Sequence, residues 1–344
     1  MKIIFRHLQS LFRQRRGSTV APRFAALRNN RGVALITVIL IVVILVAVVI
    51  ELNRSSRADI YDAANLSDGI KLTYIAKSGF YAASALIAAS PHGYNTLRDD
   101  WAKAETLSQQ SASFFTDGYF IVKIEDETGK IPINKLANGS EYNPDVREML
   151  LRLLSQPEFD LDSKKIDEII DSIKDWIDPD DEFTGSGAEN SYYASLDKPY
   201  ETKNAPIDCI EELLMVRGVT EEVLYGTKDK PGLAGFITAN SDGLVNINTA
   251  PRMVLRALSD DIDADKAQRM DEYRSNDSHD LSDTNWYKKV PGMESVPIKQ
   301  ELITLKSNYF SIISVGKMKG MSRSISGVVN KSEQSVQTIR WRQD

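Results

Sequence analysis

The chain has 344 residues, a formal net charge of −6 and a single cysteine, Cys209. One cysteine excludes an intramolecular disulfide, and the chain is long enough for two globular domains. The net charge hides an uneven distribution, because residues 1–32 contain 8 basic and no acidic side chains. Residues 33–344 therefore hold 34 basic against 48 acidic residues, a net charge of −14.

Residues 33–50 form an uncharged apolar segment that Glu51 ends. As a helix they would span roughly 27 Å, enough to cross the hydrocarbon core of a bilayer. Basic residues beside such a helix stay in the cytoplasm, so the sequence predicts a single-pass inner-membrane protein with a cytoplasmic N-terminus and an external C-terminal domain. A nucleic-acid tail or a mitochondrial presequence would also be basic, but neither explains the adjoining apolar segment.

The order of basic leader, glycine, uncharged helix and polar helix resembles the type IV prepilin-like proteins. The resemblance implies that a prepilin peptidase cuts between Gly32 and Val33, that Val33 is then N-methylated, and that the apolar helix packs into a filament. It also implies a glutamate at the fifth mature position, where this chain has Thr37.

Thr37 has no charge with which to neutralise the N-terminal ammonium of a neighbouring subunit, and an ammonium buried without a partner is strongly unfavourable. Its hydroxyl can instead bond to the carbonyl of Val33, one helical turn earlier. We therefore expect that this subunit cannot bind the N-terminus of a further subunit and that it occupies the leading end of a filament. The alternative is a tolerated polar residue in an ordinary signal anchor.

The pattern predicts that the helix continues through residues 51–90 as an amphipathic segment, which Ser90 and Pro91 end. The stripe expected to be buried is Leu52, Ile60, Leu66, Ile70, Ile75, Phe80, Ala83 and Leu86.

Alternating patterns predict strands at both ends of the remaining chain. The expected strands are 119–125 and 131–133, followed by a meander of 308–316, 321–330 and 335–342 with turns at Gly316-Lys317 and Asn330-Lys331. The middle is predicted to be helical. The expected helices are 146–154 behind Asn143 and Pro144, 166–177 capped by Asp162 or Ser163, 210–216 and 220–224 joined at Gly218, and 251–258 capped by Thr249 with Pro251 in its first turn.

Four motifs together resemble the K-type minor pseudopilins of the bacterial type II secretion system. They are DETGKIPINKL from residue 126, WIDPDDE from 176, ENSYYASLDKPY from 189, and EELLMVRGVT from 211 followed by VNINTAP from 245. The resemblance, which runs from Arg31 to about Arg342, implies an α+β fold: a pilin-like long N-terminal helix packed on an antiparallel sheet, with a large all-α insertion of helix-hairpin-helix or SAM-like type between strands.

The resemblance also implies how the chain is divided and what it does. The implied parts are a cytoplasmic leader 1–32, the transmembrane half of the helix 33–50, a pilin-like domain 51–136 and 301–344, and the helical insertion 137–300. The implied role is structural: a minor pseudopilin at the tip of a periplasmic pseudopilus, which binds the I-type and J-type minor pseudopilins, initiates the filament and supports export of folded proteins across the outer membrane.

Five carboxylates crowd into a short segment after the second predicted helix: Asp178, Asp180, Asp181, Glu182 and Glu189. They repel one another unless a cation joins them, and oxygen ligands without histidine or cysteine favour calcium. Their spacing partly matches a calcium loop, but Phe183 stands at the place of the sharp-turn glycine. The family resemblance implies two calcium ions in the insertion, and the residues alone leave one ion, two ions or a solvated acidic loop open.

Other functions find less support in the sequence. The helix-hairpin-helix-like stretches suggest DNA binding, but the second has Ser259-Asp260-Asp261 in place of a glycine hairpin and the region is acidic, so no nucleic-acid partner is expected. No enzyme is expected either, because the sequence has no GxSxG motif, phosphate-binding loop or zinc-ligand spacing. Of the three histidines, His7 lies in the leader, and His92 and His279 are expected in loops. Cys209 is expected in the core. The remaining alternatives are a minor pilin of a type IV pilus or DNA-uptake filament, and a membrane-anchored calcium-binding module.

Overall fold

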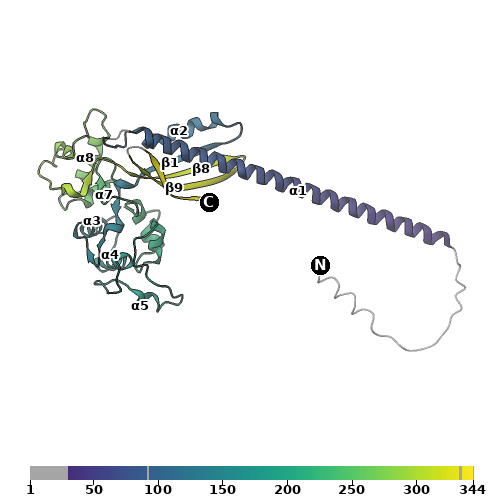
Figure 1. Cartoon of the computed structure of the whole chain (residues 1–344), viewed down its shortest axis with the longest axis horizontal. Coiled ribbons are helices and arrows are strands. Elements are labelled where there is room, and N and C mark those ends of the chain that lie inside the picture. Colours follow the sequence, from purple (N-terminus) through teal and green to yellow (C-terminus); the bar gives the residue numbers. More distant parts are fainter. Residues whose placement is uncertain (1–29, 91–92, 333–334, 344) are drawn as a thin grey trace. The chain divides into compact units, whose positions relative to one another are not determined.

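The computed structural model describes residues 30–90, 93–332 and 335–343 (Figure 1). The basic leader up to residue 29 and His92 lie outside the described residues. The chain divides into two compact units, one ending at Asn65 and one running from Leu66 to Asp344, and each is described by itself.

The first unit is the N-terminal part of α1, a single helix Asn30–Ala89. Among the described residues this is the one helix long and apolar enough to cross a membrane by length and composition, with a mean hydropathy of 3.7 in its most apolar window. Its apolar side chains from Val33 to Ile50 are exposed, as a single-pass inner-membrane anchor requires. The Thr37 hydroxyl donates to the Val33 carbonyl at 2.8 Å, which is the predicted back-bond within the helix.

The second unit begins with the C-terminal part of α1, which is buried along one stripe only from Leu72 onward. The buried residues are Leu72, Ile75, Ala76, Phe80, Ala83 and Ile87, spaced three, four or one apart as one helix face requires. The longer predicted stripe is therefore partly wrong: Leu52, Ile60, Leu66 and Ile70 are all at least half exposed. They share the helical spacing of the core residues, but among the described residues they are exposed and belong to neither buried core.

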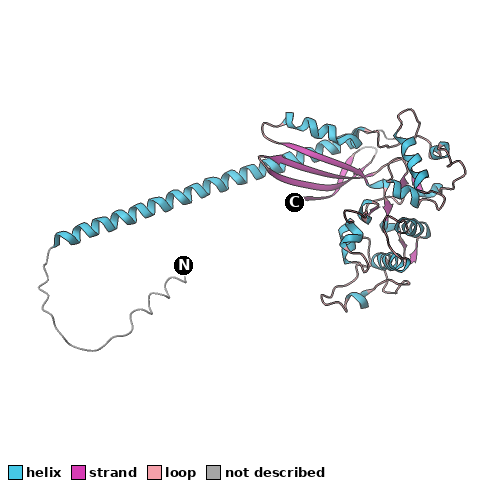
Figure 2. Ribbon diagram, turned by 180° about the vertical axis from the view of Figure 1, so that it is seen from behind, coloured by secondary structure: helices cyan, strands magenta, loops and turns pink. Residues whose placement is uncertain are grey.

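Four antiparallel strands form the main sheet in the order β1-β8-β9-β10 (Figure 2). Their bounds are β1 Tyr119–Asp126, β8 Tyr309–Met318, β9 Met321–Lys331 and β10 Val336–Gln343. The predicted turn at Gly316-Lys317 is wrong, because β8 continues through both residues and the chain turns at Lys319 and Gly320, where φ is positive. Asn330 and Lys331 likewise belong to β9.

The sheet and α1 approach closely because glycines stand at the contact. A Cβ on Gly316 would lie 2.7 Å from the Leu72 carbonyl oxygen, and one on Gly79 would lie 2.3 Å from the Ser314 hydroxyl. Helix α2, Ala104–Gln110, continues the cover beside β1. Ser108 accepts a hydrogen bond from the backbone N–H of Val122, so the edge of β1 is capped by side chains.

The insertion between β1 and β8 is built of short helices around a second hydrophobic core. Its helices are α3 Pro144–Leu154, α4 Ser163–Ile177, α5 Asn190–Tyr193, α6 Glu221–Tyr225, α7 Arg252–Ala257 and α8 Ala264–Ser275. Three short strand pairs join them: β2 Ile131–Pro132 with β5 Ile237–Thr238, β3 Ala137–Asn138 with β4 Glu141–Tyr142, and β6 Val245–Asn246 with β7 Ile303–Thr304. The buried residues of this core run from Ile131 to Leu305, and the boundaries predicted at 137 and 300 stay predictions.

Several helix predictions hold and others need correction. Asn143 and Asp162 cap α3 and α4 as predicted, and Thr220 caps α6. Residues 210–216 were predicted as an α-helix, but Ile210–Met215 is a 3-10 helix. The predicted Thr249 cap of α7 is wrong: Pro251 holds the cap position, and the Thr249 hydroxyl donates to Asp126 instead.

A buried polar network joins the two cores where β1 ends. Asp126 accepts hydrogen bonds from the Thr128 backbone N–H at 2.8 Å and from the Thr249 and Ser307 hydroxyls. Asn246, fully buried, donates to the Ser307 hydroxyl at 2.7 Å. Because the partners come from β1, from the insertion and from the segment before β8, the network fixes the insertion to the sheet.

Candidate functional site

The candidate metal site lies at the C-terminal end of α4. The helix forms because Ile166, Ile169, Ile170 and Ile173 repeat at helical spacing and all four are buried. The helix ends at Ile177, and the next residue, Asp178, still donates its backbone N–H to the Lys174 carbonyl while its own φ and ψ are extended. The loop that follows carries the acidic residues back past the last turn of the helix.

The loop brings three of the five predicted ligands together. Carboxylate oxygens of Asp178, Asp180 and Glu189 all lie within 4.8 Å of one another. Asp178 and Glu189 are each only 1% exposed, and both oxygens of Glu189 have no hydrogen-bond partner. A buried carboxylate without a partner is strongly unfavourable, so this arrangement calls for a cation or a proton.

The electrostatics of the cluster agree with its geometry. Burial raises the pKa of the Glu189 carboxyl to about 8, and the nearby negative charges of Asp175 and Asp178 add to the effect. Burial also raises the pKa of Asp178, although the Lys174 ammonium works against this. The surroundings of Glu189 and Asp178 therefore disfavour the ionised form of these two groups, whereas hydrogen bonds lower the pKa of the Asp180 carboxyl.

The other two predicted ligands point elsewhere. The Asp181 carboxylate is exposed and accepts hydrogen bonds from the side-chain amides of Asn190 and Asn204. Glu182 is exposed, and only its backbone N–H reaches the cluster, donating to Asp180 at 2.8 Å.

The calcium-loop spacing, which also puts Thr184 and Ser186 at ligand positions, does not produce a calcium-loop arrangement. Thr184 accepts a hydrogen bond from Lys174, and Ser186 donates its backbone N–H to Asp171, so the contacts of both residues are with α4. The loop turns through positive φ at Gly185 rather than at Phe183. The ligand set is thus smaller than the spacing suggested.

The sequence reasoning missed the polar side chains that α4 itself contributes. Asp171, Lys174 and Asp175 are all buried, on the face of α4 that the loop covers. Asp175 accepts the Thr184 backbone N–H at 3.1 Å, and Asp171 accepts that of Ser186 at 2.7 Å. The spacing of Asp171, Asp175 and Asp178 places them within two turns of one another, which is the signal that could have revealed them.

The donor set fits a hard divalent cation. Three carboxylates meet without histidine or cysteine, two of them are buried, and the two Glu189 oxygens are unpartnered. Such oxygens are the ligands that calcium takes, with carbonyls or water completing the shell.

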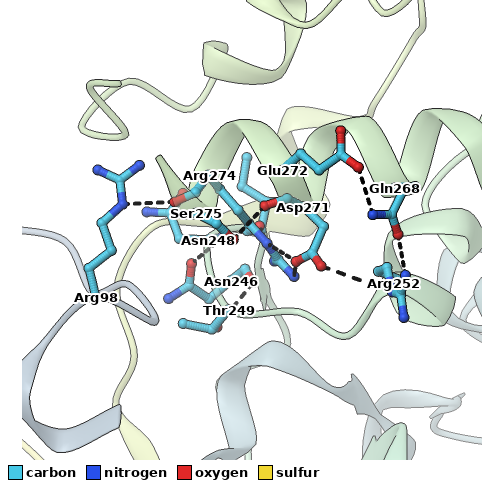
Figure 3. Close-up of polar contacts among 11 residues, drawn as sticks. Arg98, Asn246, Asn248, Thr249, Arg252, Gln268, Asp271, Glu272, Arg274 and Ser275 are labelled. Atoms are coloured by element: carbon cyan, nitrogen blue, oxygen red, sulfur yellow. Dashed lines mark hydrogen bonds and ion pairs between the residues drawn. The ribbon is translucent and has the colours of Figure 1, made fainter. Parts of the chain in front are cut away.

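A second polar cluster joins the 95–99 segment to α8 (Figure 3). Arg98 donates to the backbone carbonyls of Arg274 at 2.8 Å and His279 at 2.9 Å, and the buried Arg274 pairs with Asp271. His279 lies in a loop, as predicted, and is partly buried because its ring stacks on Tyr273 with centroids 3.8 Å apart. These contacts use backbone carbonyls and one ion pair, so the cluster is structural support for the insertion.

The remaining predicted residues occupy separate places. Gly32 and Val33 lie in the first turns of α1, and a Cβ on Gly32 would contact nothing within 4 Å. Cys209 is half-buried rather than in the core, and it lines a groove of about 200 Å³ together with Arg340.

Comparisons with known proteins cover different shares of the chain, up to 87% of it. Two family models described as type II secretion system protein K match residues 129–227 and 245–302. The chain is 26% identical over 262 residues to the type II secretion system protein K of Pseudomonas aeruginosa, which covers 74% of this chain and 76% of that protein. It is 25% identical over 321 residues to the protein K of Aeromonas hydrophila, covering 87% and 93% respectively.

A solved structure has the same fold. The chain is similar to a chain in the crystal structure of the GspK-GspI-GspJ complex from the enterotoxigenic Escherichia coli type 2 secretion system. The two chains superpose with a TM-score of 0.64 at 17% sequence identity, and the match covers 82% of this chain and 99% of the other. The predicted α+β, pilin-like fold is thereby confirmed.

Proposed function

We infer that the chain is a minor pseudopilin of the type II secretion system protein K family, and we propose that it leads the pseudopilus and initiates its assembly. Within this proposal its role in secretion is structural. The observation that carries the tip position is Thr37, whose hydroxyl is bonded within its own helix and which offers no charge to a following subunit.

The proposed partners are the I-type and J-type minor pseudopilins. The similar solved chain is part of a GspK-GspI-GspJ complex, and its likeness covers 82% of the present chain. Co-purification of the full chain with both pseudopilins from detergent extracts tests this. Association instead with the subunits of a type IV pilus or a DNA-uptake filament would contradict it.

Processing is proposed to begin at the junction of the leader and α1. A prepilin peptidase would cut between Gly32 and Val33 and leave Val33 to be N-methylated, while the basic leader holds the N-terminus in the cytoplasm and the C-terminal domain lies in the periplasm. Gly32→Ala should block the cut, which mass spectrometry of the intact protein would detect. Gly69→Ala, also in α1 and without a close neighbour, is the matched control and should be processed normally. Uncut wild-type protein in cells with an active peptidase would refute the filament assignment.

Thr37 provides the sharper test of position. Thr37→Glu would supply the carboxylate that could neutralise the ammonium of another subunit, so we expect the variant to appear within the filament body as well as at its end. Thr37→Val removes the hydroxyl without adding a charge and should keep the tip position. Cross-linking between this chain and the major subunit measures the distribution, and an unchanged pattern in Thr37→Glu would contradict the argument from charge.

Calcium is proposed as the ion of the acidic cluster. Asp178, Asp180 and Glu189 would hold it, and its charge would offset the carboxylates and fasten the loop to the end of α4. The buried Glu189 oxygens without a partner support this proposal, and the three clustered carboxylates favour one ion at this position.

A further inference from the structure

We propose that Lys174 is a cation built into the acidic cluster and that it limits the affinity of the site for calcium. The inference rests on the calcium site proposed above and concerns how that site is regulated. Lys174 lies in the last turn of α4 and is only 4% exposed, so its ammonium is inside the cluster and not in solvent.

Three groups hold the ammonium in place. Its Nζ donates to the Thr184 hydroxyl at 2.6 Å and forms an ion pair with the Asp178 carboxylate. Asp175 lies close by, with its Oδ1 at 3.9 Å from Nζ. The C-terminal end of a helix also favours a positive charge.

The anchor at Thr184 is itself fixed. The Thr184 backbone N–H donates to the Asp175 carboxylate at 3.1 Å, and Asp175 is fully buried on α4. The lysine side chain is thus enclosed between its own helix and the loop. It cannot move into solvent when a second cation enters unless the loop opens.

Lys174 and calcium would have to share one ligand. Asp178 is paired with Lys174 and is also one of the three clustered carboxylates. A calcium ion binds carboxylate oxygens at about 2.3–2.6 Å, which would place it within a few ångströms of the ammonium. Repulsion between the two cations weakens binding of the ion, and partial neutralisation of Asp178 weakens it further.

The lysine does not replace the ion. Glu189 has no hydrogen-bond partner on either oxygen, so the ammonium leaves that carboxylate uncompensated. The cluster therefore still requires an external cation, because both oxygens of Asp178 also lack a hydrogen-bond partner, and the ion pair with Lys174 offsets only part of the negative charge when calcium is absent. We infer a site that releases calcium readily while the loop stays folded.

The test compares calcium affinities of the full chain in a neutral detergent, measured by titration calorimetry with calcium chloride. Lys174→Met keeps the length and apolar stem of the side chain but removes its charge, and it should bind calcium at least tenfold more tightly, about 1.4 kcal/mol. Lys165→Met is the matched control, because Lys165 lies at the start of the same helix and pairs with Glu168 outside the cluster. Its affinity should equal that of the wild type.

The outcomes separate this inference from the site on which it rests. Wild-type binding with equal or weaker binding by Lys174→Met would overturn the role of Lys174 and leave the calcium site intact. Absence of binding in both proteins would refute the calcium site. If Lys174→Met folds only with calcium, its affinity is measured by chelator competition on protein purified in calcium, and Lys174→Gln is measured in the same way. Tighter retention of calcium than in the wild type supports the inference. Faster loss of calcium to the chelator contradicts it.

Discussion

Asp126 should make the stability of the protein depend on pH through the junction of its two cores. Its carboxylate is buried among the Thr128 backbone N–H and the Thr249 and Ser307 hydroxyls. These three donors favour the ionised form, but burial outweighs them and raises the pKa of the Asp126 carboxyl to about 6. The unfolded chain would have a pKa near the ordinary value of 3.8.

The difference in pKa between the folded and unfolded chain fixes the direction in which stability changes with pH. Because the folded state holds the Asp126 proton more tightly, the contribution of Asp126 to stability is full below about pH 4 and is lost as the pH rises through 6. A difference of about 2 pKa units corresponds to roughly 3 kcal/mol between those limits. Asp126→Asn cannot ionise, yet its amide can accept from the Thr128 N–H and donate to both hydroxyl oxygens.

Urea unfolding of residues 66–344 measures the effect, because that segment contains every buried residue of both cores. At pH 7.5 the Asp126→Asn variant should be more stable than the wild type by up to about 3 kcal/mol, and near pH 4 the two should be nearly equal. Taking the difference between variant and wild type at each pH, with a chelator present, removes the pH dependence of the acidic cluster. A difference that stays constant from pH 4 to 7.5 would refute the reasoning.

Three further predictions concern other parts of the fold. Calcium at a hundredfold excess over its dissociation constant should stabilise the wild type by about 2.7 kcal/mol in thermal unfolding. Glu189→Gln should lose most of this stabilisation, whereas Asp181→Asn, which lies outside the cluster, should keep it. Equal losses in both variants would contradict the ligand assignment. Gly79→Ala should destabilise the protein by about 1–3 kcal/mol in urea, because its Cβ would meet Ser314 and Phe120, whereas Gly69→Ala in the same helix meets nothing and should cost nothing. Arg98→Leu should lower stability by about 1–3 kcal/mol, since it leaves the Arg274 and His279 carbonyls without their donor; an unchanged urea midpoint would show that water replaces the guanidinium.

Local patterns predicted much of the fold. Strand alternation located β1, β8, β9 and β10 to within a few residues, and the Asn143 and Asp162 side chains marked the starts of α3 and α4. These features depend on neighbours a few positions away, so they can be read from the chain itself. Helix α8 was missed because its residues are mostly polar and show only a weak apolar stripe.

The parts that escaped prediction depend on distant segments. Thr249 has the sequence context of a helix cap, but its hydroxyl is used by Asp126, 123 positions away. Leu66 and Ile70 have the spacing of core residues, yet both are exposed in the described part of the chain and belong to neither core. In the acidic loop the number of carboxylates was evident, whereas the choice of Asp178, Asp180 and Glu189 over Asp181 and Glu182 follows from how the loop returns to α4. The role proposed for Lys174 needed the same information.

The placement of the insertion between β1 and β8 has a consequence for the order of folding. Asp126 and Ser307, which meet at the base of the sheet, are 181 positions apart along the chain. During synthesis β1 leaves the ribosome long before β8, the strand with which it pairs, exists, whereas the insertion can complete its own core first. Closing a loop of such length costs little more entropy than closing one half as long, and a folded insertion shortens the distance to be searched. We therefore expect sheet closure to be the late, slow step of folding, and variants that weaken the core of the insertion to slow it further.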